Sequence, residues 1–112
     1  MDDKRFLMRH FLAALAYRTQ KALRGAQPSF ASFRAAPQVR IPHELVRHMS
    51  GVLNYARTFF GGDPSLLETL PDFEAEIARF HQILEELGEH LLLGTPLRDV
   101  TPEQLPQQTI WP

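Results

Sequence analysis

Apolar residues recur at helical spacing towards the C-terminal end of the chain, and this repeat restricts the fold more than any other feature of the sequence. In residues 73–91 the steps between successive apolar residues are four, three, four, three and four. Such spacing places these residues on one face of an α-helix, and that face must be buried against other helices. We therefore predict an all-α bundle. The residues of this seam are Phe73, Ile77, Phe80, Leu84, Leu87 and Leu91.

Two earlier segments show helical patterns as well, so we expect three long helices in a single domain covering residues 1–112. The first runs from about Asp3 to Leu23, and Gly25 is its stop signal. The second runs from Pro42 to Phe60, because proline suits a first helical turn and the Gly-Gly-Asp-Pro sequence at 61–64 ends a helix. Its predicted apolar face consists of Leu45, Met49, Val52, Leu53, Ala56, Phe59 and Phe60.

The beginning of the third helix and the end of the chain carry further helix signals. The third helix is expected to start near Pro71, with Thr69 as its candidate N-cap. The sequence TPEQ at 101–104 is a capping box with proline in the first turn, but Pro106 limits that helix to about one turn. The chain therefore begins a fourth helix without completing it, and the apolar surface that such a helix would cover is left as a groove. We predict that a second copy of the chain covers this groove and forms a homodimer, or that Ile110 and Trp111 cover it instead.

The charged residues are distributed unevenly along the chain. Residues 1–57 hold ten Lys/Arg and three Asp/Glu, whereas residues 58–112 hold two and ten. Because the two halves of so small a domain carry opposite net charges, we expect them to contact each other, within one chain or between chains. This expectation is favoured over nucleic-acid binding. The arginines Arg40, Arg47 and Arg57 are expected to form a charged face or to pair with the third helix. The glutamates Glu85, Glu86 and Glu89 are expected to be solvated.

The composition restricts the chemistry and the location of the protein. The chain has no cysteine, which excludes disulfides and thiolate metal sites. It has no apolar run long enough to span a membrane. It also lacks the layout of a signal peptide, so the cytoplasm is the expected location.

His48 lies within the apolar face predicted for the second helix. It follows Leu45 by three residues and precedes Val52 by four. An ionisable side chain among core residues is costly unless it has a partner, and imidazole is a common metal ligand. Glu44 is four residues before His48, so its carboxylate can reach and orient the imidazole. Two interpretations of His48 stay open: a metal ligand, or a partly buried histidine satisfied by backbone, glutamate or water.

The other histidines bear on the same question. His43 and His48 are five residues apart, about 140° around a helix, so they do not have the four-residue spacing of the HExxH zinc motif. We expect His43 and His90 to be solvated. His10 and His81 lie beside the apolar residues of the first and third helices, so each helix could offer one imidazole to a metal in the bundle core. The long linkers allow either direction for each helix, so the sequence does not decide whether the three histidines come together.

Four segments in order resemble the DinB-like family of small bacterial four-helix bundles. They are ELVRHM at 44–49, YARTFF at 55–60, FEAEIARFH at 73–81 and GTPLRDVTPEQL at 94–105. The resemblance implies an up-and-down helical bundle and a divalent metal, zinc or nickel, held by one histidine of the second helix and two of the last. His48 matches the ligand of the second helix. The last helix has no counterpart, because Leu105 is followed only by PQQTIWP.

Two functions follow from this pattern. The first is a metal-dependent hydrolase or thiol-dependent transferase whose site is completed in a dimer, by two His48 residues or by His48 with His81 of a second copy. Glu44 would then orient His48 from behind. The second is a non-enzymatic helical dimerisation or interaction module that keeps the scaffold without the metal chemistry.

Overall fold

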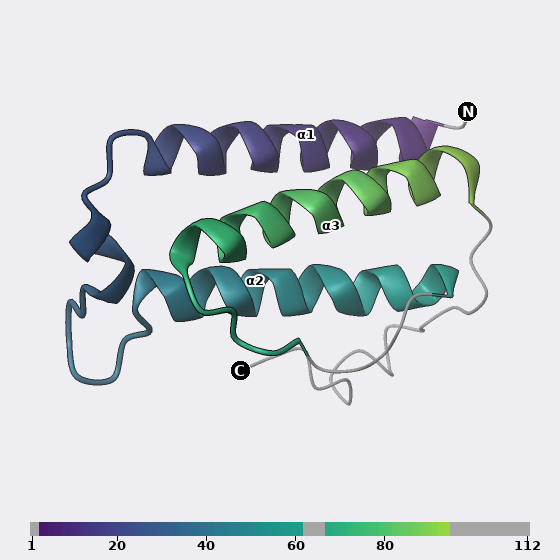
Figure 1. The fold of residues 1–112 in the computed structure, drawn as a ribbon. Coiled ribbons are helices and arrows are strands. Elements are labelled where there is room, and N and C mark those ends of the chain that lie inside the picture. The colour runs from purple at the N-terminus through teal and green to yellow at the C-terminus, as the bar shows by residue number, and fades with distance from the viewer. Residues whose placement is uncertain (1–2, 62–66, 95–112) are drawn as a thin grey trace.

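The structure is a computed structural model that describes residues 3–61 and 67–94, and this part of the chain is entirely helical. The predicted all-α bundle is therefore confirmed (Figure 1). The capping box at 101–104 and the residues Ile110 and Trp111 lie outside the described residues. The elements are α1 (Asp3–Leu23), the 3₁₀-helix η1 (Pro28–Ser32), α2 (Pro42–Arg57), the 3₁₀-helix η2 (Thr58–Phe60) and α3 (Phe73–Leu93).

The third helix is the centre of the bundle, because α1 and α2 both pack on α3 (Figure 1). The start of α1 lies at the end of α3, where Arg5 donates to the carbonyl of Leu91, so these helices are antiparallel. By contrast, α2 and α3 run parallel: His43 contacts Glu76 near their starts, and Phe60 stacks on His90 near their ends. The succession of directions is therefore up, down, down.

The parallel pair is allowed by the length of its connection. The sixteen residues of α2 make a helix about 24 Å long. The connection spans residues 61–72, and twelve residues can reach up to about 40 Å when extended. The chain can therefore return along the whole of α2 before α3 begins.

The ends of the helices follow local chemistry. Pro42 occupies the first turn of α2, as predicted, and Glu44 accepts a hydrogen bond from the backbone of Ile41 just before it. The predicted N-cap of α3 was wrong: the cap is Asp72, whose carboxylate accepts from the Ala75 amide at 2.7 Å. Gly61 ends η2 with a φ of 95°, a conformation that favours glycine.

The seam predicted for α3 forms the core. Phe80 is completely buried, and its neighbours on the seam pack against α1 and α2 through Val46, Leu12 and Met49. The first helix contributes much less, because none of its described residues is fully buried. Among the described residues, no helix has the length and hydropathy needed to cross a membrane.

The predicted apolar face of α2 was right only in part, because Met49 and Leu53 pack against the core but the fully buried stripe lies to one side of that face. The residues of α2 that are buried are Val46, Ser50 and Asn54, which recur every four residues along the helix. Leu45 and Val52, which the prediction included in the apolar face, are 46% and 37% exposed. The physical reason is that α2 carries apolar side chains around most of its circumference, so periodicity alone did not select the side that meets α3.

Candidate functional site

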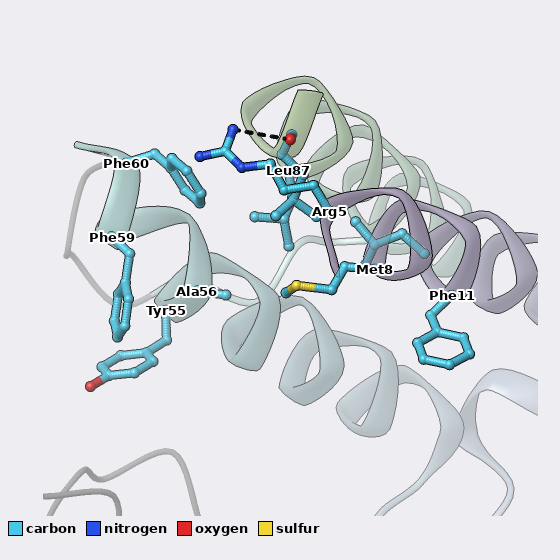
Figure 2. Close-up of a pocket in the computed structure, with 10 residues that line it drawn as sticks. Arg5, Met8, Phe11, Tyr55, Ala56, Phe59, Phe60 and Leu87 are labelled. Atoms are coloured by element: carbon cyan, nitrogen blue, oxygen red, sulfur yellow. Dashed lines mark hydrogen bonds between the residues drawn. The ribbon is translucent and has the colours of Figure 1, made fainter. Parts of the chain in front are cut away.

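A largely apolar pocket of about 560 Å³ opens between α1 and the C-terminal half of α2, with α3 as its floor. Figure 2 shows the thioether of Met8 directed towards Ala56 across this space. Pockets of this size and character are typical of ligand or partner sites. The lining residues are Arg5, Met8, Phe11, Leu12, Tyr55, Ala56, Phe59, Phe60, Leu87 and Leu91.

The α1 wall of the pocket, which includes Met8 and Phe11, continues along the helix as an exposed apolar row. Met8, Phe11 and Leu15 follow one another by three and four residues, so they lie on one side of the helix. Their side chains are 51%, 61% and 36% exposed. The α3 side of α1 is a different stripe, through Leu12 and Ala16. The row is therefore left over after α1 has packed on α3.

The opposite wall comes from α2 and η2. Tyr55 and Phe59 are in edge-to-face contact with ring centroids 5.5 Å apart, and both line the pocket together with Ala56. Val52 lies one turn before Ala56 and is also exposed, so the apolar wall continues along α2 beyond the pocket. We call this pocket, together with the two apolar rows that adjoin it on α1 and α2, the α1–α2 groove.

Arginines of α1 fix this helix to the end of α3. Arg5 donates to the carbonyl oxygens of Leu91 at 3.3 Å and Gly94 at 2.7 Å, and Arg9 donates to the carbonyl of Gly88 at 3.1 Å. The last carbonyls of a helix carry partial negative charge and lack partners within it, so cations are favourable there. These contacts fix the start of α1 to the end of α3, beside the pocket.

His48 lies on the side of α2 that faces away from α3. It is two residues from Val46 and two from Ser50, both buried, and two residues are about 200° of helical turn. Burial lowers the pKa of His48, and the positive charges of Arg40 and Arg47 lower it further. The lowered pKa of His48 favours the neutral imidazole, which is the form that binds metals.

The other predicted site residues lie elsewhere. Glu44 is exposed, accepts from the Ile41 amide at 3.1 Å and pairs with Arg34 at 3.4 Å. His81 stands edge-on to Phe80, and its Nε2 is buried without a hydrogen-bond partner among the described residues. Because His48 faces away from α3, the structure does not bring His48 and His81 together within one chain.

The distances between the candidate ligands decide whether one chain can hold a metal ion. Within residues 3–61 and 67–94, no group of three or more His, Asp or Glu side chains lies close enough to hold a metal ion. A catalytic zinc site takes about three protein ligands. The described residues of one chain therefore do not supply a complete site.

A buried carboxylate, Glu76, is the polar site that the sequence did not reveal. It is completely buried at the start of α3. Its Oε2 accepts from the Leu70 amide at 2.8 Å and from Nε2 of His43 at 3.1 Å, and its Oε1 pairs with Arg79. The same His43 nitrogen is 2.9 Å from the carbonyl of Leu70, so it must carry a proton to serve both acceptors.

These contacts correct three expectations about charged and polar residues. His43 was expected to be solvated, but it is half-buried and ties α2 to α3. Glu86 was also expected to be solvated, but it pairs with Arg57, which confirms the predicted pairing of that arginine with α3. His90 stacks on Phe60 with ring centroids 5.2 Å apart instead of pointing into solvent. Each of these partners is distant in sequence, so no local pattern specified which two residues would meet.

No protein-family model, curated protein or solved structure matches this chain. The resemblance to the DinB-like family therefore stays a prediction from the sequence segments, and the function is argued from the groove and the polar sites.

Proposed function

We propose that the chain is a non-enzymatic helical interaction module, which binds one amphipathic helix of another polypeptide in the α1–α2 groove. The observation that carries the proposal is the exposed row Met8, Phe11 and Leu15 opposite the apolar wall of α2. Contiguous exposed apolar surface on a small protein commonly marks an interaction site.

The shape of the groove favours a helix as the bound element. Its two walls are helices, and its α1 wall repeats at steps of three and four residues. An amphipathic helix presents apolar side chains at the same steps, so its side chains can interdigitate with such a row. A helix in the groove would turn the three-helix arrangement into a four-helix bundle, in which each apolar face is covered.

The proposal predicts that Phe11 contributes to binding and that an equivalent residue outside the groove does not. The probe is a fluorescein-labelled, 18-residue helical peptide with leucines at i, i+3, i+4 and i+7 and uncharged residues elsewhere. Replacing Phe11 with serine should weaken its binding about tenfold, because a large apolar contact is lost. Fluorescence anisotropy measures the affinity.

Phe6 provides a matched control for this experiment. It is 65% exposed against 61% for Phe11, and it lies five residues away on another side of the same helix. The Phe6→Ser variant should bind the peptide as tightly as the unmodified chain. Equal losses in both variants, or no peptide binding at all, would contradict the proposal.

The homodimer expected from the sequence is one specific form of this module. It would place the apolar row of a second copy in the groove. The molar mass of the purified protein, measured by light scattering, distinguishes the two forms, since a dimer that Phe11→Ser dissociates would identify a second copy as the occupant. A cytoplasmic location is also part of the proposal and is supported by the sequence patterns alone.

A second candidate is the metal-dependent chemistry implied by the DinB-like resemblance, either a hydrolase or a thiol-dependent transferase. Two observations favour it: the lowered pKa keeps His48 in its metal-binding form, and the buried Nε2 of His81 has no partner among the described residues. The remaining ligands would have to come from a second copy or from outside the described residues, and we derive no reaction step from this site.

This candidate predicts metal binding that depends on His48. After incubation with zinc or nickel, the purified protein should retain about one metal ion per chain or per dimer. His48→Ala should lose this metal, whereas His10→Ala, at an exposed position of α1, should retain it. Metal content unchanged in His48→Ala would remove His48 from the site, and a metal-free protein would exclude the candidate.

A further inference from the structure

Two cations bracket the apolar row of α1. Lys4 and Arg18 are each seven residues from Phe11, which is almost two full helical turns, so all three lie on the same side of the helix. Both side chains are exposed. Neither forms an ion pair or hydrogen bond with another described residue. The groove therefore has a free positive charge near each end of its α1 wall.

The α2 side of the groove is also positive. His48 precedes Val52 by four residues and Phe59 by eleven, so it lies on the outer stripe of α2 that borders the groove. Arg40 and Arg47 lower the pKa of His48 in addition to its burial, which shows that their positive potential reaches this stripe. Arg40 is exposed and, like Lys4, has no acidic partner among the described residues.

Acidic groups are scarce around the groove and concentrated behind it. Residues 3–60 contain ten Lys/Arg and two Asp/Glu, Asp3 and Glu44, and Glu44 is already paired with Arg34. The acidic surface of the described chain is instead on α3. Its exposed glutamates lie on the side of α3 opposite its buried seam, and they are Glu74, Glu85 and Glu89.

From this distribution we infer that the partner of the α1–α2 groove is an acidic amphipathic helix, with glutamates or aspartates flanking its apolar stripe. The inference rests on the proposed function and names the partner class of the same site. Complementary charges at the rim of an interface select the partner and speed its association. An acidic helix would place its carboxylates beside Lys4, Arg18 and Arg40 while its apolar stripe fills the groove.

The charges do not favour a second copy of this chain as the occupant. A twofold contact through the groove would bring the cations of both copies together, because the same surface meets itself. The acidic face of α3 is a poor substitute, since Glu74, Ala78, Gln82, Glu85 and Glu89 provide no large apolar side chain along it, and the exposed Leu92 and Leu93 occur only at its end.

The experiment compares two peptides that differ only in charge. Both are 18-residue helices with the same leucine row, one with glutamates and one with lysines at the flanking positions. At 50 mM salt the unmodified protein should bind the glutamate peptide about tenfold more tightly than the lysine peptide. The reason is that the cations at the rim of the groove attract glutamates and repel lysines. The Lys4→Glu/Arg18→Glu variant should lose this preference, and 500 mM salt should reduce it.

Arg24 supplies the matched control, because it is exposed, has no acidic partner among the described residues and lies beyond the end of α1. An Arg24→Glu/Lys21→Glu variant makes the same change in net charge as the double variant, away from the apolar row, and should keep the preference for the glutamate peptide. Circular dichroism checks that both variants remain helical.

The possible results separate this inference from the proposed function. Equal binding of both peptides, sensitive to Phe11→Ser, would overturn the charge preference and leave the interaction module standing. Binding of neither peptide would overturn both. A chain that binds only after Trp111→Ser would show that its own C-terminal residues occupy the groove, and a dimer dissociated by Phe11→Ser would show a second copy there. Either of these last results would overturn the inferred partner.

Discussion

At the scale of single residues, Glu76 shows how tertiary contacts change the meaning of a side chain. Its position in the first turn of α3 is typical of a glutamate that favours the helix N-terminus from solvent. In the folded chain it is completely buried, and it joins the Leu70 amide, His43 and Arg79. A buried carboxylate is tolerated only when such partners compensate for its lost hydration.

We predict that Glu76→Ala destabilises the protein by about 3 kcal/mol, because it leaves Arg79, His43 and the Leu70 amide without their common acceptor. Urea unfolding followed by circular dichroism measures the loss. Glu85→Ala is the control: this glutamate belongs to the same helix but is exposed, so its removal should change stability by about 0.5 kcal/mol or less. Similar effects of the two substitutions would show that the contacts of Glu76 are not stabilising.

At the scale of helices, α3 and α2 differ in how well their apolar pattern specifies a buried face. The seam of α3 is a single stripe, and the structure buries it as the sequence predicts. The apolar residues of α2 extend around the helix, and its α3-facing stripe includes the polar Ser50 and Asn54. Ser50 is small and Asn54 accepts a hydrogen bond from Arg57, so both residues can be buried at the contact with α3. Leu45 and Val52 lie on the exposed side of α2 instead.

The difference between buried and exposed leucines of α3 can be tested within the helix. Leu84 is 4% exposed and packs in the core, whereas Leu93 is 83% exposed. Leu84→Ala should therefore lower the free energy of unfolding by about 3 kcal/mol, the typical cost of a core cavity. Leu93→Ala should leave it nearly unchanged. A small effect at Leu84 would indicate that the seam is not the core.

At the scale of the whole molecule, the placement of α3 between α1 and α2 creates both the groove and its charge. Because α1 and α2 each pack on α3, their remaining apolar rows face the space between them. The opposed charges of the two halves of the chain meet partly within one molecule, as in the pair Arg57–Glu86. What remains is a positive groove on one side and exposed glutamates of α3 on the other.

For the part of the chain that the structure describes, the sequence by itself determined the three long helices, nearly all of their ends and the buried seam of α3. These features depend on residues a few positions apart, such as Pro42 at a helix start, Gly61 at an end and the three-and-four spacing from Phe73 to Leu91. The helical pattern singled out His48 and the resemblance matched it to a metal ligand, but its role stays a proposal because it lies on the outer side of α2. The sequence analysis predicted an uncovered apolar groove, but it did not predict which residues form the walls.

Only the tertiary structure decided the parallel course of α2 and α3, the side of α2 that meets α3, and the burial of Glu76 with His43. Each depends on contacts between residues some thirty positions apart, as in the pairs His43–Glu76 and Phe60–His90. Helical periodicity records which residues share a side of one helix, but it contains no information about which neighbour that side meets. That choice depends on the packing of all three helices at once.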